Sequence, residues 1–398
     1  MTGTVTGTEG GAAAGPELLL PGSDGTLAPY RMVGHPLEPT TGPPANSRIA
    51  YAAAHVVADP LADNTPGRPA RLDWDATLEF RHHLWRHGLG VADAMDTAQR
   101  GMGLDWATTA ELIRRSAAEA NAVGGRLVCG AGTDQLPPGE HDLAAVLQAY
   151  EEQLAVLEDG GAGVVLMASR ALAAGAAGPA DYAKVYGSLL EQVRRPVLLH
   201  WLGPMFDPAL TGYWGSTDLD LATDAFLQII AAHPDKVDGV KVSLLDADRE
   251  VALRRRLPEG VRCYTGDDFH YPELILGDRH GHSDALLGVF DPIAAAASAA
   301  LAALDAGDED GYRRIFAPTV PLARLVFAEP TFHYKTGIVF LAWLAGHQRH
   351  FSMVSGMQSA RSLPHLGQLF VLADQAGLLP DPDLAAARMR ALLAVAGL

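Results

Sequence analysis

The chain alternates short apolar runs, each long enough for one strand, with longer stretches of helical spacing, and this alternation restricts the fold more than any other feature. Strands that alternate with helices are typical of βαβ units, in which helices cover a parallel sheet. Eight strand positions can be placed along residues 46–291, and their landmark residues are His55, Asp96, Gly130, Ala168, His200, Lys241, Thr265 and Val289. Eight is the number that a closed (β/α)8 barrel requires.

A doubly wound open sheet is the alternative for such a pattern. That fold usually carries a glycine-rich nucleotide loop after its first strand, and no Gly-x-Gly-x-x-Gly sequence follows the apolar run 49–57. We therefore expect an α/β protein, a TIM barrel with a helical C-terminal extension. The predicted divisions are an N-terminal extension that is partly disordered or a small hairpin (1–45), the barrel (46–291) and a C-terminal helical region (292–398).

Charge and cysteine content narrow the class of partner. The formal net charge of -17 at pH 7 argues against nucleic acid or an anionic membrane as the main partner, since both attract clustered lysine and arginine. Cys129 and Cys263 lie in apolar runs, which suits a reduced, cytoplasmic protein better than a disulfide framework. The apolar run 293–304 is too short to cross a bilayer, and the N-terminus shows no secretory signal. We expect a small-molecule substrate.

Lys241 stands in the middle of a short apolar strand, Lys-Val-Asp-Gly-Val-Lys-Val-Ser-Leu-Leu (236–245). Side chains alternate between the two faces of a strand, so Gly239, Lys241 and Ser243 share one face. Burial lowers the pKa of a lysine and makes the free amine available to attack a carbonyl carbon, which gives a Schiff base. A lysine that reaches water from the strand end, or that pairs with a carboxylate, is the structural alternative.

Other polar residues recur where predicted strands end, and in a TIM barrel these ends form the face that carries the active site. The residues placed there, besides Lys241 and Ser243, are His55, Asp96, Thr133, Asp134, His200, Asp267 and Asp268.

Four segments resemble one family of barrel enzymes. They are Gly-Val-Lys-Val-Ser (239–243), Thr-Gly-Asp-Asp (265–268), Gly-Ala-Gly-Thr (130–133) and Pro-Val-Leu-Leu-His-Trp (196–201), the last followed by Pro204 and by Thr211-Gly212. With these segments the chain resembles the dihydrodipicolinate synthase and N-acetylneuraminate lyase family of class I aldolases, and more closely an actinobacterial branch of it. The resemblance implies a covalent Schiff base with the substrate at Lys241, no cofactor, and a homodimer or homotetramer.

The sequence departs from the family pattern at two places. His200 stands where the family has a tyrosine that relays a proton, and a histidine is also able to act as general acid or base. Asp-Thr-Ala-Gln-Arg (96–100) aligns with the family's Gly-Thr-Thr-Gly-Glu, which binds the pyruvate carboxylate. The pocket for that carboxylate is therefore rebuilt or lost, which argues against pyruvate as the nucleophilic substrate. Arg100 would replace that pocket as a bidentate carboxylate ligand, or it is a surface arginine.

We predict aldol cleavage or condensation of a keto acid or keto sugar. Lys241 would form the imine, His200 would move the proton of the reacting hydroxyl, and Ser243 would hydrogen-bond the oxygen beside the imine. The predicted substrate-binding residues are His55, Asp96, Thr97, Arg100, Thr133, Gly266, Asp267 and Asp268. A dehydratase that uses the same imine is the nearest alternative, and a non-catalytic sugar-acid sensor is another.

Histidines after the seventh strand offer a metal-dependent alternative. His270, His280 and His282, with nearby aspartates, would suit a divalent ion of a lyase or isomerase, although their spacing fits no tight metal motif. A polar loop over the barrel is the structural alternative. His82, His83 and His87 are expected to be solvated on the polar side of a helix. Lys335 is the second lysine in a conspicuous setting, at the predicted start of a C-terminal helix.

Overall fold

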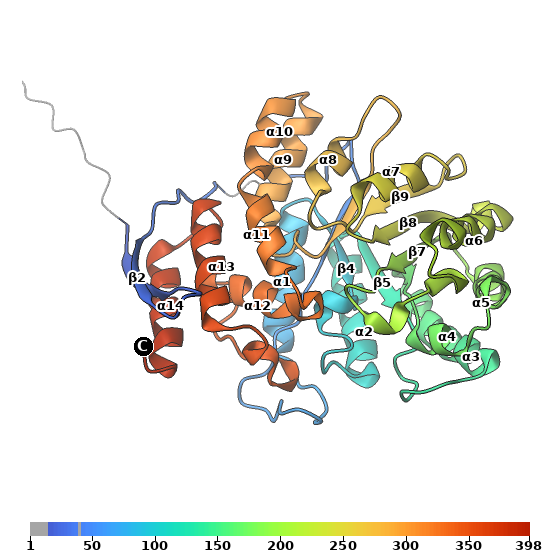
Figure 1. The fold of residues 1–398 in the computed structure, drawn as a ribbon, viewed down its shortest axis with the longest axis horizontal. Coiled ribbons are helices and arrows are strands. Elements are labelled where there is room, and N and C mark those ends of the chain that lie inside the picture. Colours follow the sequence, from blue (N-terminus) through green and yellow to red (C-terminus); the bar gives the residue numbers. More distant parts are fainter. Residues whose placement is uncertain (1–14, 39–40) are drawn as a thin grey trace, which may run out of the picture.

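The computed structural model describes residues 15–38 and 41–398. The predicted disorder of the first residues falls on 1–14, which lie outside the described residues. Eight parallel strands close into a barrel in the order β10-β3-β4-β5-β6-β7-β8-β9, which confirms the predicted fold class (Figure 1). Their bounds are β3 (Ala50–Ala53), β4 (Gly90–Asp93), β5 (Leu127–Ala131), β6 (Gly163–Leu166), β7 (Val197–Leu202), β8 (Val237–Ser243), β9 (Arg262–Thr265) and β10 (Asp284–Leu287).

Helices follow the strands and form the outer layer of the barrel. Their bounds are α1 (Trp74–Arg86), α2 (Trp106–Val123), α3 (Leu143–Asp159), α4 (Arg170–Gly175), α5 (Pro179–Gln192), α6 (Leu219–Ala232), α7 (Ala247–Arg254) and α8 (Tyr271–Leu276). An aspartate side chain caps the N-terminus of α1, α2, α3, α6 and α7, where it accepts a hydrogen bond from a backbone amide. A carboxylate at this position also interacts favourably with the helix dipole. These caps fix where each loop ends and each helix begins.

The barrel interior is apolar below its mouth. The side chains that pack there come from alternate positions of the strands and include Ala92, Val128, Val165, Leu198, Tyr264 and Leu286. Gly239 on β8 leaves room for the ring of Tyr264, because a Cβ there would lie 2.7 Å from a ring carbon. Lys241 and Ser243 follow Gly239 on the same face of the strand. They therefore lie above this apolar layer, toward the carboxyl ends of the strands.

The C-terminal region is helical and lies beside the barrel, where it also packs on an N-terminal hairpin (Figure 1). The hairpin strands are β1 (Glu17–Pro21) and β2 (Leu27–Arg31), and the helices are α9 (Ala294–Asp305), α10 (Glu309–Phe316), α11 (Thr319–Val326), α12 (Tyr334–Leu344), α13 (Leu363–Gln375) and α14 (Pro382–Val395). Buried Asp374 on α13 accepts hydrogen bonds from the Tyr30 hydroxyl at 2.6 Å and from the amides of Val33 and Gly34. This carboxylate fastens the hairpin to the C-terminal helices.

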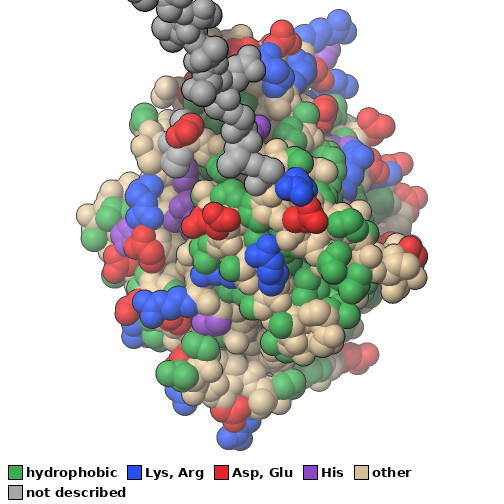
Figure 2. All heavy atoms as spheres, turned by 90° about the vertical axis from the view of Figure 1, so that its left-hand side faces the viewer, with side chains coloured by type: hydrophobic (Ala, Val, Ile, Leu, Met, Phe, Trp, Pro, Cys, Tyr) green, Lys and Arg blue, Asp and Glu red, His purple; other side chains and the backbone are tan. Residues whose placement is uncertain are grey.

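The face that contains the hairpin carries charged side chains of both signs among hydrophobic ones (Figure 2). Arg31, for example, pairs with Glu17 across the two hairpin strands. Among the described helices, none combines the length and the apolar character that a membrane span requires.

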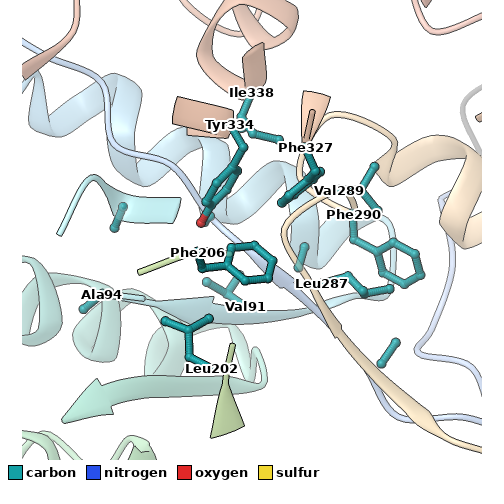
Figure 3. Close-up of a cluster of buried hydrophobic side chains, with 14 of the residues drawn as sticks. Val91, Ala94, Leu202, Phe206, Leu287, Val289, Phe290, Phe327, Tyr334 and Ile338 are labelled. Atoms are coloured by element: carbon teal, nitrogen blue, oxygen red, sulfur yellow. The ribbon is translucent and has the colours of Figure 1, made fainter. Parts of the chain in front are cut away.

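Three aromatic rings, two from the C-terminal region and one from the loop after β7, meet over the barrel mouth (Figure 3). Tyr334, the first residue of α12, stacks on Phe327 with 4.5 Å between ring centroids, and both contact Phe206 from the loop after β7. Gly288, which follows β10, lets Phe327 approach, because a Cβ there would lie 2.9 Å from its ring. The C-terminal region thus forms one wall of the cavity above the strands.

Histidines of α1 are less exposed than the sequence predicted. The ring of His83 lies 4.1 Å from that of His347 and 4.7 Å from that of His87, and His87 is buried while His82 is half-buried. The expectation that these side chains are solvated was wrong, because residues after α12 cover this helix. Burial lowers the pKa of His83 to about 2 and that of His347 to about 4.

Acidification should therefore destabilise the protein through these two imidazoles. Both stay neutral in the folded state, whereas in the unfolded chain each takes up a proton near pH 6.5. Stability is unaffected by them above that pH and falls as the pH drops below it. We expect each to cost about 1.4 kcal/mol at pH 5.5. Urea unfolding at pH 7.5 and 5.5 measures this loss.

The variant His347→Gln should lose less stability between these two pH values than the wild-type protein. His35→Gln, at an exposed histidine, serves as the control and should leave the difference unchanged. An identical pH dependence in all three proteins would contradict this account of the histidine cluster.

Candidate functional site

Lys241 lies on the inner face of β8, beside His200 of β7 and Tyr264 of β9 in the strand register. Its side chain is 8% exposed, and no hydrogen bond or ion pair joins its Nζ to another described residue. Burial lowers the pKa of this lysine, and the charges of Asp96 and Asp268 oppose that shift only in part. The amine therefore loses its proton more readily than an exposed lysine does, and it is held inside the barrel mouth.

Asp268 is a buried acid whose charge, like that of Asp96, acts on this amine. Its Oδ1 accepts a hydrogen bond of 2.8 Å from the amide of Val289, which fixes the carboxyl group after β9. Burial raises its pKa to about 7, while the positive charge of Lys241 acts in the opposite direction. The two groups titrate as a pair, which holds either an ammonium and a carboxylate or a neutral amine and a carboxylic acid. Such a pair supplies a nucleophile and a proton donor at once.

His200 is completely buried next to Lys241. Its Nε2 lies 3.1 Å from the Ser243 hydroxyl, and its Nδ1 has no hydrogen-bond partner among the described residues. Burial, together with the charge of Lys241, lowers the pKa of His200 well below its usual value. The imidazole is therefore neutral near pH 7, and the proton path open to it within the protein runs through Ser243.

Gly266 permits the close packing of these groups. Its amide donates a 2.7 Å hydrogen bond to the carbonyl of Val242, so the loop after β9 passes directly over β8. A Cβ at Gly266 would lie 2.1 Å from the Ser243 Oγ and 3.0 Å from the Lys241 Cε. Any side chain at this position would displace the predicted nucleophile, which gives the glycine a steric function.

Two predicted substrate ligands are held by protein partners. His55 is completely buried, and its ring nitrogens contact the Asp291 carboxylate at 2.8 Å and the Gln348 amide oxygen at 3.1 Å. Arg100 is also buried, which corrects the expectation of a surface arginine. Its guanidinium donates to Asp134, Gln153 and the carbonyls of Ala94 and Gly130, so all five donors are used. A substrate carboxylate would have to displace one of these partners, which corrects the role predicted for Arg100.

Asp267 and Thr97 organise the mouth of the barrel. Asp267 accepts hydrogen bonds from the amides of Phe269 and His270, and its other oxygen lies 2.9 Å from His270 Nδ1. It therefore fixes the loop after β9. Thr97 Oγ1 lies 2.9 Å from the hydroxyl of Tyr334, which joins the loop after β4 to α12.

A pocket of about 630 Å³ opens beside this cluster. Asp96 and Thr133, both predicted from the sequence, line it, together with Tyr334 and Lys335 of α12. Lys241 does not line this pocket, but Asp96 acts electrostatically on Lys241 and on Lys335. Asp96 thus lines the pocket and lies within electrostatic range of both lysines.

The alternative metal ligands do not come together. His270 contacts Asp267, while His280 Nε2 accepts a hydrogen bond from Arg279, and His282 lies in the irregular segment just before β10. Across residues 15–38 and 41–398, no group of three or more His, Cys, Asp or Glu side chains has the arrangement of a metal site.

A comparison with known protein families assigns the chain to one of them. Residues 18–398 match the family model described as "Protein of unknown function (DUF993)". The chain belongs to the DUF993 family. No curated protein matches it.

Solved structures with a similar fold include dihydrodipicolinate synthases. The enzyme from Aquifex aeolicus is 14% identical with a TM-score of 0.63, and the alignment covers 83% of this chain and 99% of that one. The Thermotoga maritima enzyme is 15% identical with a TM-score of 0.62, over 83% of this chain and 99% of that one. YagE of Escherichia coli K12, a prophage protein of the same family solved with pyruvate, is 15% identical with a TM-score of 0.64, over 84% and 100%. These matches confirm the predicted resemblance in the fold.

Tyr334 and Lys335 are pocket residues that the sequence did not predict for this site. The sequence predicts Lys335 at the start of a C-terminal helix, which α12 confirms, but that prediction gives no indication of the pocket. Neither residue is close in sequence to a barrel strand end, so only the tertiary fold places them at the pocket.

Proposed function

We propose that this protein is a class I lyase that cleaves or forms a carbon–carbon bond of a keto acid or keto sugar through a Schiff base at Lys241. The observation that carries the proposal is the Lys241 Nζ, which is buried on the inner face of the barrel and has no hydrogen-bond or ion-pair partner among the described residues. The shared fold with the dihydrodipicolinate synthases, one of them solved with pyruvate, supports it.

The proposed reaction begins with the neutral form of the Lys241 amine. The Lys241 Nζ attacks the substrate carbonyl carbon, and the carbinolamine that results loses water to give a protonated imine. Asp268 in its acid form donates the proton that water needs to leave. In the cleavage direction a base removes the proton of the substrate hydroxyl, the carbon–carbon bond breaks, and its electron pair moves into the imine to give an enamine. Protonation and hydrolysis of the enamine then free the lysine.

His200 would accept the proton of the reacting hydroxyl, and Ser243 would hydrogen-bond the oxygen beside the imine. The neutral His200 accepts a proton through the Ser243 hydroxyl, which lies on the same strand face as Lys241. Because the imidazole is buried, its protonated form is short-lived and the proton returns to the product. The role of Asp96 would be to hold substrate hydroxyls at the edge of the pocket.

Substrate-dependent trapping tests this function. The protein is incubated with a panel of keto acids and keto sugars, reduced with sodium borohydride, and weighed by intact mass spectrometry. We expect a mass increase equal to the reduced imine for at least one compound, and no change when borohydride is added alone. A protein that stays unmodified across the panel would count against the proposal. Product analysis of a compound that is trapped separates carbon–carbon cleavage from loss of water.

The variant Gly266→Ala should slow imine formation by on the order of 10²-fold, because its methyl group displaces Ser243 and the stem of Lys241. The rate of adduct formation after borohydride quenching measures this. Gly178→Ala is the control, since a Cβ there meets nothing within 4 Å and the backbone is extended. Adduct formation at the wild-type rate in Gly266→Ala would show that this close packing is unimportant.

A further inference from the structure

The 630 Å³ pocket beside Asp96 is larger than a three-carbon keto acid needs, and its volume falls in the range of sites for drug-sized ligands. Its walls come from the loops after β4, β5, β6 and β7 and from the segment that begins with η5 (Thr331–His333) and continues into α12. Most of the lining is apolar and includes Leu104, Leu136, Met167, Ala168, Phe206, Leu210 and Phe332. An apolar wall of this extent favours a ligand with a hydrocarbon or aromatic portion.

Lys335 brings a buried cation to this apolar pocket. The residue is 1% exposed, and its Nζ donates one hydrogen bond of 2.9 Å, to the backbone carbonyl of Arg100. The nitrogen also lies 4.9 Å from the centre of the Phe332 ring and 5.7 Å from that of Tyr334. An ammonium group has three donors, so two remain for a ligand.

The charge of Lys335 is not neutralised by a direct ion pair with a described residue. Burial lowers its pKa to about 8, which leaves it mostly protonated at pH 7. A buried cation without a direct counterion is costly, and an anionic ligand group would remove that cost. Arg100 and Arg170 also line the pocket, but Arg100 uses its donors within the protein and Arg170 pairs with Asp207. Lys335 is therefore the best placed of the three cations.

We propose that the substrate is a carboxylic acid with an extended apolar arm, whose carboxylate binds Lys335 and whose arm lies along the apolar wall of the pocket. This substrate class rests on the proposed function, in which a carbonyl group of the same compound passes Asp96 to reach Lys241. Lys335 binds the carboxylate in place of Arg100, for which that role was predicted but whose donors are all used within the protein. Pyruvate would occupy only a small part of this site.

Binding measurements on the full-length Lys241→Met protein test the substrate class without imine formation. The probes are unbranched 2-oxo acids with three, four, six and eight carbons, and the methyl ester of the longest one, studied by isothermal titration calorimetry. We expect the dissociation constant to fall about fourfold for each buried methylene. The ester should bind at least about tenfold more weakly than its acid, as expected for loss of a charge-assisted hydrogen bond.

Two variants in that background test separately the contribution of the Lys335 charge and that of the apolar wall. Lys335→Met should remove the preference for the acid over the ester while keeping the dependence on chain length. Ala168→Leu fills the pocket at the end of β6, so it should remove the dependence on chain length while keeping the preference for the acid. Lys184→Met, at an exposed lysine of α5, is the control and should change neither. Circular dichroism verifies that each variant is folded.

The outcome distinguishes this inference from the proposed function. Equal affinity for all chain lengths, or equal affinity for acid and ester, would overturn the substrate class even if wild-type Lys241 is trapped by borohydride. Chain-length-dependent binding of acids without any trapping in the wild-type protein would support the binding site and contradict the Schiff base.

Discussion

The Lys241→Met variant should lose the borohydride-dependent mass increase completely and should retain at most about a thousandth of the wild-type kcat/KM. The amine is the group that bonds to the substrate, so its removal removes the imine. Methionine fits the space of the lysine stem, and Asp268 is able to stay protonated in its buried position, so the fold should persist. Intact mass spectrometry and steady-state kinetics with a trapped substrate measure the two effects.

The pH dependence of trapping gives a second readout of the same lysine. Because burial lowers its pKa, the neutral amine is populated at a lower pH than in an exposed lysine. The rate of adduct formation should rise with pH through this lowered pKa and level off above it. Lys184→Met, at an exposed lysine, should behave as the wild-type protein does. Normal turnover by Lys241→Met would show that the chemistry takes place elsewhere.

The Arg81→Met variant should lower the free energy of unfolding by about 3–5 kcal/mol. Arg81 of α1 and Asp93 of β4 form an ion pair with both side chains completely buried and nitrogen–oxygen distances of 2.8 and 3.1 Å. The guanidinium also donates to the carbonyls of His55 and Thr77, and the carboxylate accepts from the Ala94 amide. Removing the arginine leaves a buried carboxylate with too few partners.

An exposed ion pair on the same helix is the matched control. Arg86 contacts Glu79 at 2.7 Å, with side chains that are 53% and 64% exposed, so Arg86→Met should cost less than about 1 kcal/mol. The double variant Arg81→Met/Asp93→Leu should recover part of the stability, because neither charge remains buried. Urea unfolding measures all three proteins. Equal losses for Arg81→Met and Arg86→Met would contradict the importance of the buried pair.

The barrel was predictable because its signals are local. Each strand is an apolar run of a few residues, and an aspartate at the start of the following helix marks where the loop ends. The alternation of side chains along β8 also predicted that Lys241 and Ser243 share a face. Strand alternation alone does not decide which face is inside, and the resemblance to aldolases supplied that choice.

The surroundings of the site were harder to predict because they depend on contacts between distant segments. His55 lies at a strand end as expected, but Asp291 and Gln348 hold its ring, and these partners follow far along the chain. Arg100 was judged from its five-residue motif, which contains neither Asp134 nor Gln153. A local pattern shows which donors a residue has, and only the folded chain shows which of them are used.

The same limit explains why the C-terminal wall of the pocket was not foreseen. Tyr334 and Lys335 begin an apolar helix whose spacing resembles that of any buried helix. Tyr334 is placed over the barrel by its contacts with the rings of Phe206 and Phe327 (Figure 3). Gly288, which lets Phe327 approach, is also distant from α12 in the sequence.

Peptide mapping of the borohydride-reduced adduct identifies the lysine that forms the imine, because two buried lysines, Lys241 and Lys335, lie near the mouth of the barrel. After incubation with a substrate that is trapped, reduction and proteolysis, tandem mass spectrometry locates the modified residue. We predict the substrate-derived mass on Lys241 and an unmodified Lys335. An adduct on Lys335 with Lys241 unmodified would contradict the account.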